Sequence, residues 1–116
     1  MSVEDTVRTL RERARREQQQ REAHAAATRV AVEEAVRTHL PEQGRAWLIG
    51  SLAWGGFGER SDVDLVLSGV GSAQATEIQD AVVRAAGTAV DMLVLEELPA
   101  SFRARVESQG CALHGR

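Results

Sequence analysis

The stretch LIGSLAWGGFGERSDVDLVLSG, residues 48–69, joins two apolar runs through a glycine-rich segment. AWLIG at 46–50 is predicted to be a buried strand, and DVDLVL at 62–67 is predicted to be a second one. Asp62 and Asp64 stand at the start of this second strand. Because side chains alternate along a strand, both carboxylates project from the same face, where they repel each other. The pair therefore predicts a compensating cation.

A third carboxylate opens the next apolar run. Asp91 lies near the start of AVDMLVL at 89–95, which is predicted to be a third strand. If this strand lies beside the second one, Asp62, Asp64 and Asp91 converge at one end of a sheet. Oxygen ligands alone favour Mg²⁺ over zinc, and such a cluster can hold two divalent ions that promote an in-line phosphoryl displacement. The three aspartates are the predicted metal ligands and catalytic residues.

Gly50 and Ser51 follow the first strand and open the glycine-rich segment. Glycine lets the backbone come close to a ligand, and bare N–H groups with the Ser51 hydroxyl can meet anionic oxygens. Gly-Ser, ten residues, Asp-x-Asp and then a third aspartate on a strand therefore describe a triphosphate site that faces a metal site.

The remaining sequence is predominantly helical. Residues 3–39 contain no glycine or proline and are followed by Pro41, which predicts one long helix or two. Further helices are expected at 72–87 and from Pro99 to about residue 108, with a short tail after them. The alternation of helices and strands predicts a single α/β layer structure.

The length of 116 residues predicts one domain, with a helical extension at 1–40 and a catalytic core at 45–114. One cysteine excludes an internal disulfide, and we expect no signal peptide or membrane span and a cytoplasmic location.

The net charge of −3 argues against nucleic acid as the main partner, although all 14 basic residues are arginines. Between Arg8 and Arg21 there are six arginines and two glutamates, a local excess of 6 − 2 = +4. Residues 15–22 contain no apolar side chain, so this part of the helix is expected to be solvated. A docking surface for a partner helix or for RNA phosphates is the other interpretation.

The quoted stretch, together with AVDMLVLEELP at 89–99, resembles the polymerase β-like nucleotidyltransferase superfamily, and in particular its minimal nucleotidyltransferases (MNT). The resemblance covers residues 46 to about 114. It implies that Asp62 and Asp64 bind metal, and that Asp91 binds the second metal and helps to deprotonate the acceptor hydroxyl. It also implies the minimal nucleotidyltransferase fold, an α/β fold in which helices flank a small mixed sheet of three to four strands and a long helix precedes it. Two Mg²⁺ ions and ATP as substrate are implied as well. The predicted nucleotide-binding residues are Gly50, Ser51, Arg60 and Ser61, of which Gly50 and Ser51 match the family motif.

One position departs from the family pattern. Many minimal members read Ala-Arg-Gly after Gly-Ser, whereas this chain has Ala53, Trp54 and Gly55. The missing arginine removes a phosphate contact, although Trp54 could stack on a base and Arg60 lies a few residues further on. Catalytic competence is nevertheless expected.

Minimal nucleotidyltransferases are commonly paired with a helical HEPN toxin, so the resemblance implies an antitoxin that transfers AMP from ATP to a toxin hydroxyl. The short core has little surface for an acceptor pocket, and we expect a partner protein or a second subunit to supply the acceptor. Two other hypotheses remain open. The chain could be a non-catalytic antitoxin that sequesters a helical partner, or a toxin that adds nucleotides to tRNA.

Overall fold

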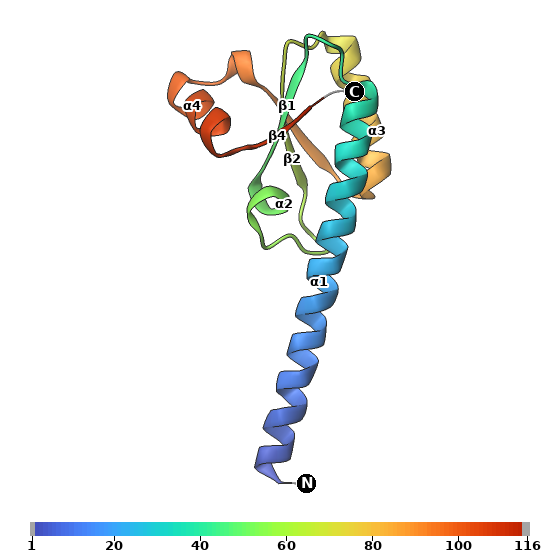
Figure 1. The fold of residues 1–116 in the computed structure, drawn as a ribbon, viewed down its shortest axis with the longest axis vertical. Coiled ribbons are helices and arrows are strands. Elements are labelled where there is room, and N and C mark those ends of the chain that lie inside the picture. The colour runs from blue at the N-terminus through green and yellow to red at the C-terminus, as the bar shows by residue number, and fades with distance from the viewer. Residues whose placement is uncertain (1, 115–116) are drawn as a thin grey trace.

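The computed structural model describes residues 2–114, and a single four-stranded sheet forms its centre (Figure 1). β1 is antiparallel to both β2 and β4, whereas β2 and β3 run parallel. The sheet is therefore mixed, which confirms the expected α/β fold. In the order β3-β2-β1-β4, the strands are Val90–Val94, Val63–Ser68, Arg45–Ile49 and Cys111–Leu113.

Helices cover both faces of the sheet. On one face, Leu48 packs in a cluster with Val36 of α1 (Val3–His39) and Ile78 of α3 (Ser72–Ala86). On the opposite face, Trp47 packs with Val106 of α4. This two-sided burial explains why β1 is apolar at successive positions rather than at alternate ones. The other helices are α2 (Gly50–Trp54), the 3-10 helix η1 (Leu95–Glu97) and α4 (Ala100–Gln109).

Helix α1 is continuous over 37 residues, so the sequence prediction of one helix or two resolves to one. Ser2 caps its first turn by accepting a hydrogen bond from the Asp5 backbone N–H at 3.1 Å. Only the last part of the helix is buried in the core, through Thr28, Val32 and Val36. The first half projects beyond the sheet, so the molecule extends 62 Å along its longest axis (Figure 1).

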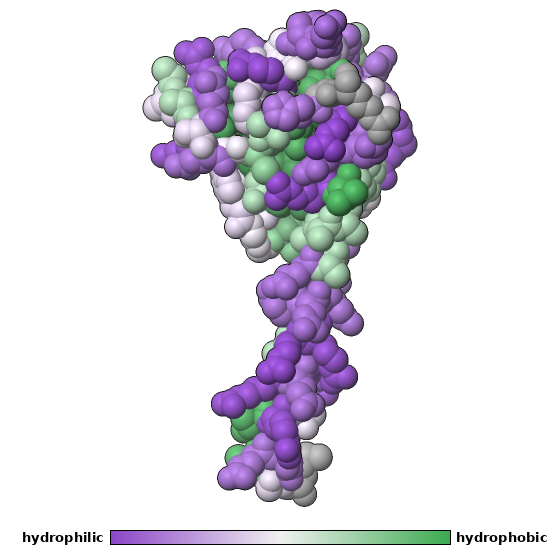
Figure 2. All heavy atoms as spheres, viewed as in Figure 1, coloured by the Kyte–Doolittle hydropathy of each residue, from purple (hydrophilic) through white to green (hydrophobic). Residues whose placement is uncertain are grey.

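The surface of α1 reflects this division. The projecting half is largely hydrophilic, with small apolar areas near its tip (Figure 2). Val3 and Leu10 are among the exposed large apolar side chains of this half. Within residues 2–114, no helix is both long and apolar enough to cross a membrane.

The segment after α4, expected to be a tail, forms the edge strand β4. Ala46 pairs with Leu113 and Leu48 with Cys111, so β4 covers the edge of β1 that β2 leaves free. Leu113 is buried in the main core cluster. Three residues are too few to show an alternating pattern, and tertiary pairing alone defines this strand.

Candidate active site

Strand register brings the three predicted aspartates, Asp62, Asp64 and Asp91, to one end of the strands β2 and β3. We call this end of the sheet the acidic edge. In the parallel pair β2–β3, Asp64 is the direct partner of Asp91. Partners on neighbouring strands lie about 5 Å apart and project from the same face. Asp62 lies one residue before β2 and two residues before Asp64. Because side chains alternate, the Asp62 side chain is directed to the same face as that of Asp64. The condition on which the sequence argument depended, that the third strand lies beside the second, is thus met.

The three carboxylates differ in exposure. Asp62 and Asp91 are exposed, whereas Asp64 is partly buried. By alternation, Asp64 shares its face with Val66, which packs against Leu95 of η1 and Val106 of α4. Burial raises the pKa of the Asp64 carboxyl, and the negative charges of Asp91 and Asp62 raise it further. Asp64 is therefore the carboxylate that gains most from a nearby positive charge.

The donor chemistry of this edge suits a hard divalent cation, because all three side chains offer carboxylate oxygens. The ion would also relieve the repulsion that raises the pKa of Asp64. Within residues 2–114, however, no three acidic, histidine or cysteine side chains are already gathered around one point. The backbone brings the aspartates together, and a three-ligand arrangement requires their side chains to turn toward a common ion.

Gly50 lies directly against Asp64. Ile49, the last residue of β1, pairs with Asp64, and the chain turns at Gly50 with φ of +70°. A Cβ atom at Gly50 would lie 2.2 Å from Asp64 Oδ2, closer than a side chain can approach. The glycine of the Gly-Ser pair therefore both permits the turn and leaves space for the Asp64 carboxylate.

Ser51, the second residue of this pair, lies at a hollow of about 350 Å³. Leu52, Gly55 and Phe57 line the same hollow from the glycine-rich segment, and residues of α1 form its opposite wall. The structure thus places Ser51 beside a cavity as well as one residue from the glycine that contacts Asp64.

Arg60 and Ser61 lie in the loop before β2. Both line a second hollow, of about 720 Å³, which also has α1 as one wall. Ser61 Oγ accepts a hydrogen bond from the Gly58 backbone N–H at 2.9 Å, and this bond closes the loop. None of the three aspartates lines either hollow, but Ser61 is followed directly by Asp62.

Trp54 occupies the position where the family pattern has arginine. Its indole Nε1–H donates to the backbone carbonyl of Gln109 at 3.0 Å, and its side chain is 55% exposed. The hydrogen bond ties the end of α2 to the end of α4. Trp54 thus has a structural contact of its own and carries no charge for a phosphate.

Sequence reasoning missed two residues that line the hollows. Arg21 lines both of them, and His24 lines the larger one while its ring stacks on Phe57 with centroids 6.0 Å apart. Both come from α1, far from the Gly-Ser and aspartate positions in sequence. The local excess of arginine between Arg8 and Arg21 includes Arg21, whereas no pattern in the sequence singles out His24.

Comparison with known proteins shows which folds and which family this chain is similar to. No curated protein sequence gives a significant match. A crystal structure of a toxin–antitoxin with AMP-PNP is similar in fold, with a TM-score of 0.58 and 21% identity over 74% of this chain and 72% of that one. A mutant of the toxin–antitoxin MntA-HpeT has a TM-score of 0.57 and 20% identity over 72% of this chain and 69% of that one.

These similarities confirm the predicted fold, with its four-stranded mixed sheet and long N-terminal helix. The family described as "Nucleotidyltransferase domain" matches residues 30–113, which include Gly50, Ser51 and the three aspartates. The match begins within α1, close to where that helix enters the core. The chain therefore belongs to the nucleotidyltransferase domain family.

Proposed function

We propose that this chain is a cytoplasmic antitoxin that transfers AMP from ATP to a hydroxyl of a helical, HEPN-like toxin, with two Mg²⁺ ions. The observation that carries the proposal is the contact of Gly50 with Asp64, together with the pairing of Asp64 with Asp91. A phosphate-binding turn and an acidic edge meet at this point. The similarity to a toxin–antitoxin with AMP-PNP supports both the nucleotide and the partner.

Each residue of the site has a role that its position supports. Asp62, Asp64 and Asp91 hold the metal ions, and the Gly50 turn brings the Ser51 hydroxyl and backbone N–H groups to the phosphates. Arg60 and Ser61, in the loop beside Asp62, extend this phosphate site. Asp91 is exposed, so an acceptor hydroxyl from outside the molecule can reach it.

The reaction is an in-line displacement at the α-phosphorus of ATP. The acceptor oxygen forms a bond to this phosphorus while the bond to the pyrophosphate oxygen breaks, and pyrophosphate leaves with the bonding electrons. Asp91 takes the hydroxyl proton. Bound magnesium supplies positive charge that offsets the charge on the phosphate oxygens. The chain's own contribution is to hold these groups in line at the edge of a rigid sheet.

The test uses the purified protein, its cognate helical partner, Mg²⁺ and ATP labelled at the α-phosphate. The partner should become labelled and lose its toxicity. Asp64→Asn should reduce labelling at least about a hundredfold, because it removes one ligand charge at the centre of the site. Asp80→Asn is the matched control, since Asp80 is an exposed aspartate on α3, outside the acidic edge. It should leave the labelling unchanged.

The proposal fails if the partner stays unlabelled and Asp64→Asn protein neutralises it as well as the unchanged protein does. Label on RNA instead of protein would select the tRNA-modifying hypothesis, which the arginines of α1 support. Both outcomes leave the fold assignment intact.

A second candidate function is a binding antitoxin without catalysis. The exposed residues Val3, Val7 and Leu10 follow one another at helical spacing along the projecting half of α1. The uncharged Trp54 at the arginine position favours the same candidate. Deleting residues 2–16 should then abolish neutralisation while the aspartate variants remain active, which is the reverse of the result that the catalytic proposal predicts.

A further inference from the structure

Both hollows beside the glycine-rich segment share one wall, which is the middle of α1. From this helix, the larger hollow is lined by Glu17, Gln20, Arg21 and His24, and the smaller one by Gln18, Arg21, Glu22 and Ala25. Arg21 lines both, together with Ser61 in the first and with Ser51 in the second. It thus connects the two segments that the proposed function assigns to phosphate binding.

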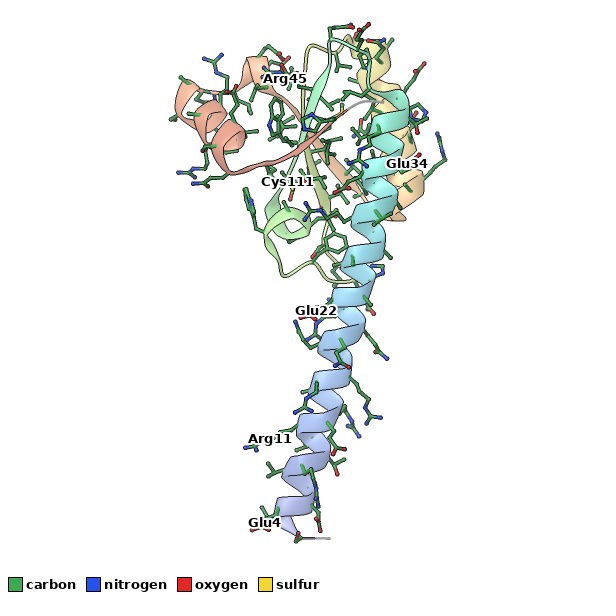
Figure 3. All side chains as sticks on the ribbon, in the orientation of Figure 1. Glu4, Arg11, Glu22, Glu34, Arg45 and Cys111 are labelled. Carbon is green, nitrogen blue, oxygen red and sulfur yellow. The ribbon has the colours of Figure 1, made fainter. Side chains whose placement is uncertain are left out.

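The helix is anchored immediately after Arg21. His24 stacks on Phe57, Ala25 packs against the core cluster and Thr28 is buried. Arg21 therefore lies within a turn of fixed contacts, although most of α1 before it projects into solvent. Glu22, labelled in Figure 3, marks the level at which the helix passes the end of the domain.

The guanidinium of Arg21 is available to an anion. Its Nη2 donates to Gln18 Oε1 at 2.6 Å, so a neutral amide orients it. By contrast, Arg8 pairs with Asp5, and Arg29 pairs with Glu33 at 2.9 Å. Across residues 2–114, no acidic side chain forms an ion pair with Arg21. Its positive charge is therefore free to bind a phosphate.

We propose that Arg21 binds the polyphosphate of the nucleotide and supplies the cation that Trp54 does not. This inference rests on the proposed function, because it assigns a further binding residue to the same site. A planar guanidinium suits phosphate oxygens, and the Arg21 side chain reaches the cavity that Ser51 lines. The long helix is thereby one wall of the nucleotide site as well as a projection.

Acidic residues offset part of this charge. Glu17 and Glu59 line the larger hollow together with Arg21 and Arg60. The larger hollow therefore carries both positive and negative side chains. Removing a positive or a negative one is expected to change the nucleotide affinity in opposite directions. Removing Arg21 should weaken nucleotide binding, whereas Glu17→Gln should strengthen it, because it removes a negative charge near the phosphates.

Isothermal titration of the full chain with AMP-PNP and Mg²⁺ tests the assignment. Arg21→Gln should weaken binding about tenfold through loss of a charge-assisted contact, and Arg21→Lys should recover part of it. Arg16→Gln, an exposed arginine on α1 that lines neither hollow, is the control and should change the affinity less than about twofold. Adenosine, which has no phosphate, should bind the unchanged protein and Arg21→Gln equally.

Equal AMP-PNP affinity of the unchanged protein and Arg21→Gln overturns the inference and leaves the proposed function standing. Equal losses for AMP-PNP and adenosine overturn it too, because Arg21 would then contact the nucleoside. A loss confined to an RNA oligonucleotide also overturns it. If the unchanged protein binds no AMP-PNP, the proposed function fails and the inference fails with it.

Discussion

At the residue scale, Gly50 shows how the fold and the site constrain each other. Its φ of +70° is unfavourable for any residue with a Cβ atom, and the space that a Cβ would fill holds Asp64 Oδ2. Gly50 is thus required for two reasons: the backbone adopts a positive φ, and the Asp64 carboxylate occupies the space of a side chain. The two reasons can be separated experimentally, because Gly87 also has a positive φ but has no atom close to where a Cβ would lie.

Gly50→Ala should therefore lose both stability and activity. The positive φ should cost about 1 kcal/mol of unfolding free energy, and displacement of the Asp64 carboxylate should reduce AMP transfer at least about tenfold. Gly87→Ala is the matched control, since Gly87 has φ of +68° and no neighbouring atom within 4 Å of a Cβ there. It should lose similar stability and retain full transfer. Equal transfer rates for the two variants would show that the Gly50 contact with Asp64 has no part in the chemistry.

At the element scale, α1 consists of a projecting, exposed half and a half that packs on the core. Val32 and Val36 are fully buried against the sheet, while the residues that precede Thr28 are mostly exposed. A helix this long is stable because its last three turns pack on the core, and the polar half continues from that anchor. The core face of α1 is therefore as much a part of the domain as the strands are.

Two valines of this helix test the division. Val32→Ala should destabilise the protein by about 2 to 3 kcal/mol, because it removes buried methyl groups and leaves a cavity. Val30→Ala, two residues earlier at a side chain that is 67% exposed, should change the stability by less than about 0.5 kcal/mol. Urea denaturation measures both. Equal losses would mean that the valines are not on opposite sides of the helix in solution.

Elements with a strong local pattern were predictable from the sequence, and elements defined by tertiary pairing were not. Asp64 and Asp91 each lie near the start of an apolar strand. From this position the sequence predicts that they lie side by side if the two strands are neighbours, as they are. Strand β4 has no such pattern, and its existence depends on the free edge of β1. Arg21 was missed for a related reason, since its approach to Ser51 depends on how α1 packs and not on any motif.

At the scale of the whole molecule, both hollows lie toward one end of the domain. The hollows lie where the glycine-rich segment meets α1, and the projecting half of the helix extends away from that level (Figure 1). A partner that contacts the projecting helix would therefore lie near the acidic edge. This arrangement favours an acceptor hydroxyl that arrives with another protein.

Metal binding tests the central claim, that Asp62, Asp64 and Asp91 act as one site, most directly. Manganese replaces magnesium as the probe, and electron paramagnetic resonance measures free Mn²⁺ in the presence of AMP-PNP. Asp91→Asn should weaken Mn²⁺ binding at least about tenfold, although its strand differs from that of Asp64, while Asp80→Asn should leave it unchanged. Mn²⁺ affinity that is the same in Asp91→Asn as in the unchanged protein would contradict the account.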